Sequence, residues 1–174
     1  MTQAPILQAN RRPLRGLPLL GVALLCGPAL WRPAAAQAAD RGAVFDANCS
    51  MCHQLGAAGV PGQFPRLAGR AGRIAATAAG KGYLERAVLF GMMGNITVDG
   101  AAIAGGVMPS FSSLSDQDLA EALNYITSLD ASGTLHWKGA LFKPADIAGV
   151  RAGKPLSPMQ VHQLRAAAIG KARP

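Results

Sequence analysis

The feature that most constrains this chain is a five-residue segment, Cys49-Ser50-Met51-Cys52-His53, which places two thiols and an imidazole close together. The 174 residues contain only one further cysteine, Cys26. With so few cysteines, the chain has no framework of long-range disulfides to hold a small fold together. The fold must therefore present these three side chains to something other than distant cysteines.

The spacing Cys-x-x-Cys-His is typical of c-type haem attachment. Two thiols three residues apart can reach the two vinyl groups of one porphyrin, and the adjacent imidazole is then held beneath the iron. We therefore predict one covalently bound haem c, attached through Cys49 and Cys52, with His53 against the iron.

Three other uses of this segment fit the sequence less well. A thioredoxin-like redox pair requires a βαβ context, which the sequence does not offer. A structural zinc site requires further ligands, and the remaining His136 and His162 have no cysteine partner. A simple disulfide between Cys49 and Cys52 would leave His53 unexplained.

Residues 1–38 have the organisation of an export signal. Basic residues precede an apolar run at residues 17–30, and Ala36-Gln37-Ala38 predicts cleavage after Ala38. The run is shorter than the roughly 20 residues of a membrane-spanning helix and contains prolines, so we expect no stable membrane anchor. Because bacteria attach haem to cysteine outside the cytoplasm, export to the periplasm agrees with the haem prediction. The need for reduced thiols favours unfolded export over the twin-arginine route that Arg11-Arg12 would serve.

The segment after the signal predicts helices, a loop and a hairpin. A short helix follows Asp40 and runs towards Cys49, a loop rich in glycine and proline covers residues 55–82, and a second helix covers residues 83–90. Asp99-Gly100 between short alternating segments predicts a hairpin. The clearest helix has Ser115 as its N-cap and buries one apolar face, made of Leu119, Ala122, Leu123, Ile126 and Leu129.

The composition changes after Asp130. Residues 39–130 hold six basic and eight acidic residues, whereas residues 131–174 hold seven basic residues and one acid. This basic extension predicts two short helices, at residues 144–152 and 158–166, the second opened by a capping box between Ser157 and Gln160. Such an extension can dock on a partner or wrap its own domain, and the sequence leaves both possibilities open.

The iron needs a second axial ligand or an open site, and Met108 is the strongest candidate. It lies in Gly105-Gly106-Val107-Met108-Pro109, where the glycines allow the backbone to approach a flat cofactor and Pro109 stiffens the chain. The alternative is that Met108 is a core side chain. The other methionines after the initiator lie in the attachment segment, in the tail, or where apolar packing is expected: Met51, Met159, Met92 and Met93.

Together these features resemble class I monohaem c-type cytochromes over residues 39–130. The resemblance implies an all-α cytochrome c fold, with three main helices around the haem and a small hairpin before the Met-Pro loop. Residues 131–174 would then be a C-terminal helical extension of this domain. Residues 91–111 are similar to the corresponding stretch of bacterial monohaem cytochromes that serve periplasmic dehydrogenases or oxidases.

The resemblance also implies roles for single residues. His53 would be the proximal and Met108 the distal iron ligand. Phe45 would meet Tyr125 where the first and last helices cross. A backbone carbonyl, at Pro61 or Pro65, would orient the His53 ring.

An iron with two axial ligands binds no substrate, so the expected function is electron transfer and not catalysis. The chain would serve as a free carrier or as the cytochrome subunit of a dehydrogenase or oxidase chain. Its expected partners are a periplasmic dehydrogenase as donor and a cytochrome oxidase or another cytochrome as acceptor, and nucleic acid is not expected. The alternative is a haem enzyme or gas sensor, such as a small peroxidase, with an open or labile distal site.

Overall fold

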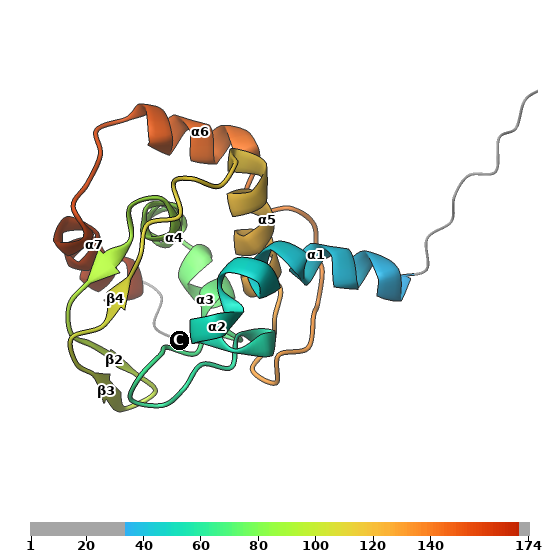
Figure 1. The fold of residues 1–174 in the computed structure, drawn as a ribbon, viewed down its shortest axis with the longest axis horizontal. Coiled ribbons are helices and arrows are strands. Elements are labelled where there is room, and N and C mark those ends of the chain that lie inside the picture. The colour runs from blue at the N-terminus through green and yellow to red at the C-terminus, as the bar shows by residue number, and fades with distance from the viewer. Residues whose placement is uncertain (1–33, 171–174) are drawn as a thin grey trace, which may run out of the picture. The chain divides into compact units, whose positions relative to one another are not determined.

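The computed structural model describes residues 34–170, which are rich in helix and contain only short strands. This agrees with the predicted all-α fold. No helix among these residues is long and apolar enough to cross a lipid bilayer. In chain order the elements are α1 (Ala34–Asn48), α2 (Ser50–His53), the 3-10 turn η1 (Leu55–Ala57), α3 (Ala71–Ala75), α4 (Ala78–Phe90), β1 (Met92–Met93), β2 (Ile96–Val98), β3 (Ala101–Ile103), β4 (Val107–Met108), α5 (Asp116–Thr127), α6 (Pro144–Ala152) and α7 (Pro158–Gly170) (Figure 1).

The crossing of α1 and α5 is the contact that the resemblance implied. The ring centroids of Phe45 and Tyr125 lie 5.3 Å apart, a separation at which aromatic rings attract each other. At the start of α5, Ser115 Oγ accepts a hydrogen bond from the Asp118 N–H, as predicted for the N-cap. Four residues of the predicted apolar face are buried on α5, and the fifth, Leu129, is buried just beyond the end of the helix at Thr127. The prediction for this helix is confirmed.

Helix α1 is longer than predicted, because it begins at Ala34 and not after Asp40. Alanine is the best helix former, and the alanine-rich residues before Asp40 continue the helix towards the N-terminus. The predicted cleavage point after Ala38 therefore lies within α1. Residues 1–33 of the predicted signal lie outside the described residues.

The predicted loop at residues 55–82 was too long. It contains η1 and α3, and α4 begins at Ala78 with Thr77 as its N-cap, whose Oγ1 accepts a 3.0 Å hydrogen bond from the Gly80 N–H. Glycine argued against helix here, but Gly80 is needed for packing. A Cβ at this position would overlap the Ile74 carbonyl oxygen, so only glycine lets α3 and α4 meet.

The hairpin is confirmed, and a second strand pair lies beside it. β2 and β3 pair antiparallel around Asp99-Gly100, whose φ angles of 50° and 81° fit the predicted turn. β1 pairs with β4, so that Met92 lies opposite Met108. Two-residue strands have no alternation to detect, which is why the sequence did not predict this pair. Its consequence is that the Met-Pro loop is tied to the end of α4.

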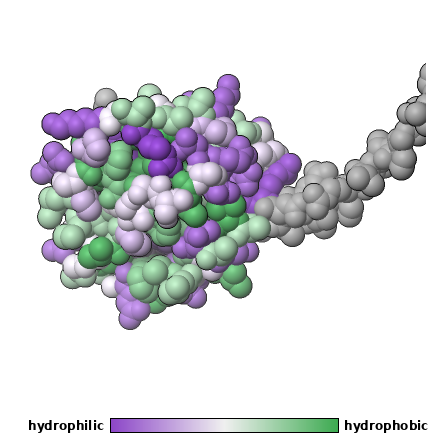
Figure 2. Space-filling view, turned by 45° about the horizontal axis from the view of Figure 1, so that its top comes forward, coloured by the Kyte–Doolittle hydropathy of each residue, from purple (hydrophilic) through white to green (hydrophobic). Residues whose placement is uncertain are grey.

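The basic extension packs on its own domain. Helix α7 lies against α4 and β1, and α6 lies against α5 and α4 (Figure 1). Phe142, Ile147 and Val161 are completely or almost completely buried. Both predicted helices are present, and Ser157 and Gln160 form the predicted capping box. Figure 2 shows hydrophobic patches interspersed with hydrophilic residues on the face that it draws, as is usual for globular domains.

One buried amide fastens the start of the extension. Asn124 of α5 accepts hydrogen bonds from the N–H groups of Leu141 and Phe142 through its Oδ1 atom, and its Nδ2 donates to the Phe142 carbonyl, each at 2.8 Å. Ion pairs join the later part to the domain, at Lys81–Asp146 and Arg151–Asp116. The extension therefore wraps its own domain, one of the two arrangements that the sequence left open.

Candidate functional site

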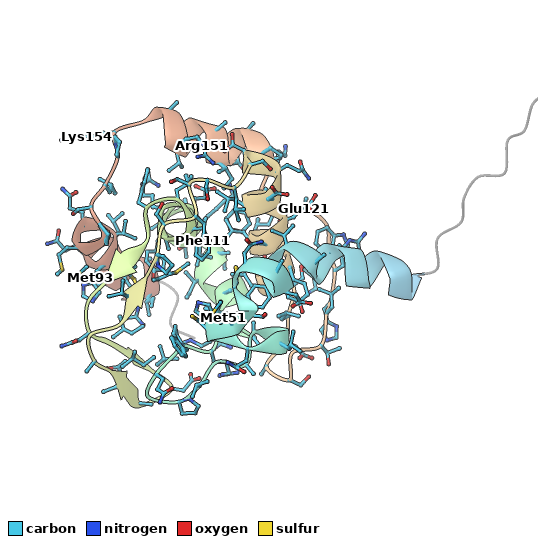
Figure 3. All side chains as sticks on the ribbon, viewed as in Figure 1. Met51, Met93, Phe111, Glu121, Arg151 and Lys154 are labelled. Atoms are coloured by element: carbon cyan, nitrogen blue, oxygen red, sulfur yellow. The ribbon has the colours of Figure 1, made fainter. Side chains whose placement is uncertain are left out.

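The two thiols lie where α1 ends and the short helix α2 begins. The His53 N–H donates to the Cys49 carbonyl at 2.9 Å, so one helical turn carries both cysteines and the histidine. Cys49 and Cys52 are partly exposed and form no disulfide, whereas His53 is buried. Met51, between the cysteines, is 88% exposed (Figure 3). The turn therefore buries its imidazole and leaves both cysteines partly exposed.

The imidazole of His53 is held by a backbone carbonyl. Its Nδ1 lies 2.9 Å from the Pro65 oxygen, so the carbonyl is at Pro65 and not at Pro61. A carbonyl only accepts hydrogen bonds, so Nδ1 must carry the proton, and in the neutral ring Nε2 keeps its lone pair. Burial lowers the pKa of His53, against the weaker opposing effect of the Pro65 hydrogen bond. The ring is therefore neutral, oriented, and able to bind a metal through Nε2.

The segment with Met108 is fastened to α4 on both sides of the methionine. β4 pairs with β1, and the Phe111 N–H donates to the Val88 carbonyl at 2.9 Å. Gly91, between α4 and β1, has a φ of +75°, and a Cβ there would lie 2.5 Å from the Met108 carbonyl oxygen. Glycine at this position thus allows the end of α4 to approach the backbone of Met108.

Met92 and Met108 line the same cavity, but their sulfur atoms are in different states. The Met92 sulfur accepts a 3.2 Å hydrogen bond from the buried Tyr83 hydroxyl. No such bond engages the Met108 sulfur among the described residues. The other described methionines are exposed: Met51, Met93 and Met159.

The cavity joins these groups. It has a volume of about 310 Å³ and opens beside both cysteines. A smaller cavity of about 80 Å³ adjoins it and shares part of its wall, made of His53, Pro65, Met92, Ile96 and Met108. Most of the remaining lining is apolar, including Phe64, Ile103, Pro109 and Phe111. Such a site suits a flat apolar group reached by thiols at its edge and by a nitrogen and a sulfur from its faces.

The other uses of the cysteines do not fit this geometry. Burial, and next the neighbouring Cys52, raise the pKa of the Cys49 thiol to about 11, whereas a reactive redox cysteine needs a lowered pKa. Among the described residues, no group of three or more His, Cys, Asp or Glu side chains is placed to hold a metal ion. A thioredoxin-like pair and a zinc site are therefore both disfavoured.

Comparison with known proteins agrees with the geometry. The family model "Cytochrome c" matches residues 39–130. The chain belongs to the cytochrome c family. It is 39% identical over 122 residues to cytochrome c-552 of Thermus thermophilus, and the match covers 69% of this chain and 90% of that protein. A second cytochrome c-552, from a particular strain of the same species, is also 39% identical over 122 residues, with 80% of its length covered.

Family membership determines the cofactor. This cytochrome carries covalently bound haem c with iron, and proteins of the family are electron carriers with redox partners. The residues present fit this group, because the two thiols, the neutral imidazole and the apolar cavity lie together. The alignment with cytochrome c-552 is longer than residues 39–130, so the similarity extends beyond the family core.

The smaller cavity also contains residues that the sequence did not indicate. Arg66, Arg70 and Tyr83 line it, together with Arg165 and Ile169 of α7. Arg165 lies far beyond the attachment segment in the sequence, and no motif marks it. Only the packing of α7 on α4 brings it to the site.

Proposed function

We propose that this cytochrome transfers single electrons in the periplasm through a six-coordinate haem. Cys49 and Cys52 hold the haem through thioether bonds, His53 binds the iron through Nε2, and Met108 binds it through sulfur. The observation that carries the proposal is that His53 and Met108 line both adjoining cavities, whereas the Met92 sulfur is engaged by Tyr83.

When bound, haem supplies an iron that changes between Fe(II) and Fe(III). The chain's own residues keep it there and limit its chemistry. Pro65 orients the His53 imidazole, and the strand pair β1–β4 positions Met108. With His53 and Met108 both holding the iron, no position would remain for a substrate, and a thioether ligand would favour Fe(II) relative to a second histidine. Electron transfer at a neutral to high potential is the result, and the protein is a carrier rather than an enzyme.

An absorption spectrum of the oxidised holoprotein tests the ligand assignment. We expect the weak charge-transfer band from the methionine sulfur to the iron. Met108→Ala should abolish this band while covalent haem is retained. Met92→Leu, a matched change of the other methionine that lines both cavities, should keep it. A five-coordinate, high-spin spectrum of the unsubstituted protein would contradict the proposal and favour the haem enzyme or gas sensor.

Periplasmic location is supported by the basic and apolar segment at residues 11–30 and by the requirement for haem attachment outside the cytoplasm. The partners that suit such a carrier are a periplasmic dehydrogenase as donor and a cytochrome oxidase or another cytochrome as acceptor. Fractionation of cells and N-terminal sequencing of the haem-containing protein test the location. Haem protein retained in the cytoplasm with an intact N-terminus would contradict it, and copurification from the periplasm would identify the partner.

A further inference from the structure

The smaller cavity brings together three arginines from two parts of the chain. Arg66 and Arg70 come from the cytochrome core, in the segment just before α3, and Arg165 comes from α7 in the extension. The cavity also contains the imidazole of His53 and the side chain of Met108. A cluster of guanidinium groups beside an apolar site is unusual, because each charge loses hydration there.

One carboxylate partly balances this cluster. Asp99, at the hairpin turn, binds Arg66 at 2.9 Å and Arg70 at 2.8 Å. The hydrogen bond from Arg66 is the largest of the effects that hold the pKa of Asp99 below its ordinary value, so Asp99 is ionised. Three positive groups and one negative group leave a surplus of two positive charges at the cavity.

Arg165 differs from the other two arginines of this cluster in its partners. Its Nη2 donates to the Thr97 carbonyl at 3.0 Å, and it lines the smaller cavity together with Tyr83. Among the described side chains it forms no ion pair with a carboxylate. Tyr83 cannot serve as the counter-charge, because burial raises its pKa and keeps the phenol neutral.

The environment of Arg165 favours an added anion. The guanidinium is half-buried, and its pKa is lowered, first by burial and also by the nearby positive charge of Arg70. Both effects destabilise the charged guanidinium of Arg165. A carboxylate beside it would offset them, because an arginine side chain binds a carboxylate through two parallel N–H groups. Haem c brings two propionate carboxylates, whose charge equals the surplus in the cavity.

We propose that Arg165 binds a haem propionate, so that the C-terminal extension forms part of the cofactor site. The proposal rests on attachment of the haem through Cys49 and Cys52, as described above. Arg165 then positions the haem edge and keeps its propionate ionised. Because Fe(III) carries one more positive charge than Fe(II), the arginine also favours the reduced state and raises the reduction potential.

The test compares holoprotein variants by their reduction potential as a function of pH. Arg165→Gln should lower the potential. It should also move the inflection caused by propionate ionisation to higher pH by about one unit, because a nearby opposite charge lowers a carboxyl pKa by one unit or more. Arg165→Lys keeps a positive charge but not the fork, so its inflection should move in the same direction by a smaller amount. It also gives a readable result if the Gln variant fails to fold.

Arg151→Gln is the matched control. Arg151 also lies in the extension and binds the core, through Asp116 and the carbonyls of Ser112 and Leu114, but it does not line the cavity. Its loss should lower stability and leave the inflection in place. If Arg165→Gln likewise lowers stability without moving the inflection, Arg165 is a structural residue and the proposal is overturned.

A second control distinguishes the ionisation of the propionate from that of other ionisable groups near Arg165. His162 is an ionisable group that lies one turn earlier on α7, with Nε2 2.8 Å from the Asn95 carbonyl oxygen. Asp99, Arg66, Arg70 and Tyr83 face the same region. His162→Gln should keep the inflection, and an inflection that disappears in this variant would assign it to His162 and overturn the proposal.

Failure of the ligand assignment remains distinguishable from failure of this proposal. The sulfur-to-iron band is recorded for every variant. Its absence from the unsubstituted protein would contradict ligation by Met108. The effect of Arg165 on the propionate inflection would still be measured, because the thioether bonds retain the haem.

Discussion

The cytochrome core and the C-terminal extension bury their side chains for different purposes. In the core, the apolar residues around His53 and Met108 line the cavity that we propose for the haem. In the extension, three apolar side chains are buried: Phe142, Ile147 and Val161. Its helices α6 and α7 pack on α4, α5 and β1 of the core. The core therefore depends on a group that the chain does not encode, whereas the extension completes the packing with side chains of its own.

Because of this difference, substitutions in the two regions should affect different properties of the protein. Changes in the packing of the extension should alter folding stability and leave the axial ligands in place. Changes near Met108 should alter the iron site. Arg165 is the proposed exception, since it comes from the extension and faces the cofactor cavity.

Phe142→Ala should have the largest effect on stability. The side chain is 1% exposed and fills space between the core and the extension, so its removal should cost about 3–5 kcal/mol of unfolding free energy. Leu141→Ala is a matched control, because Leu141 is the preceding residue and is 45% exposed. Urea denaturation of the holoproteins measures both. A Phe142 variant as stable as the Leu141 variant would mean that the extension is not part of the core.

The core was the more predictable of the two regions, because its signals are local. Cys49, Cys52 and His53 are adjacent in sequence, Ser115 caps a strongly periodic helix, and Asp99-Gly100 is a strong turn signal. Each of these features depends on neighbours within a few residues. The four residues predicted to hold the haem lie around one cavity: Cys49, Cys52, His53 and Met108.

What the sequence missed depends on contacts between distant segments. In the sequence, Gly80 argues against a helix. In the structure, glycine is required there because a Cβ would overlap the Ile74 carbonyl oxygen. The β1–β4 pair is too short to have a periodicity. The charge of the extension was compatible with either a partner or its own domain, and only the buried Phe142 and the hydrogen bonds of Asn124 decide that it wraps the domain. Local propensity carries no information about such contacts.

Gly91→Ala should have an intermediate effect and should show itself at the iron. Gly91 has a φ of 75° and a ψ of −179°, a region essentially restricted to glycine, where a residue with a side chain pays about 1–3 kcal/mol, and the Cβ would in addition displace the Met108 backbone. We expect a loss of about 2 kcal/mol or more and a sulfur-to-iron band that is lost at lower denaturant concentration than in the unsubstituted protein.

Gly105→Ala is the control for the crowding near Met108. Gly105 has a similar φ of +64°, but a Cβ there would meet nothing within 4 Å. This variant should pay only the backbone strain and should keep the band as the unsubstituted protein does. If both variants lose the band at the same denaturant concentration, the close approach of Gly91 to Met108 does not position the ligand. That result would also contradict the expectation that changes near Met108 alter the iron site, and so weaken the comparison of core and extension.

Asp146→Asn should have the smallest effect, and its pH dependence tests the polar link between the two regions. Asp146 Oδ2 accepts hydrogen bonds from Lys81 Nζ of the core at 2.7 Å and from the Lys143 N–H at 3.0 Å. The bond from Lys81 is the largest cause that holds the pKa of Asp146 below its ordinary 3.8. A carboxyl with a lowered folded-state pKa stabilises the fold fully above its ordinary pKa, and this contribution is lost as the pH falls through the lowered value.

The side chain of Asp146 is 35% exposed, so solvent screens the pair and the expected loss at pH 7 is below about 1 kcal/mol. Urea denaturation of both proteins at several pH values should show a stability difference that is constant near neutrality and shrinks below about pH 3.8. A difference that persists unchanged in acid would mean that the variant acts through the packing of α6 and not through the charge. In that case apolar burial alone would fasten the extension, and the polar link to Lys81 would contribute nothing measurable.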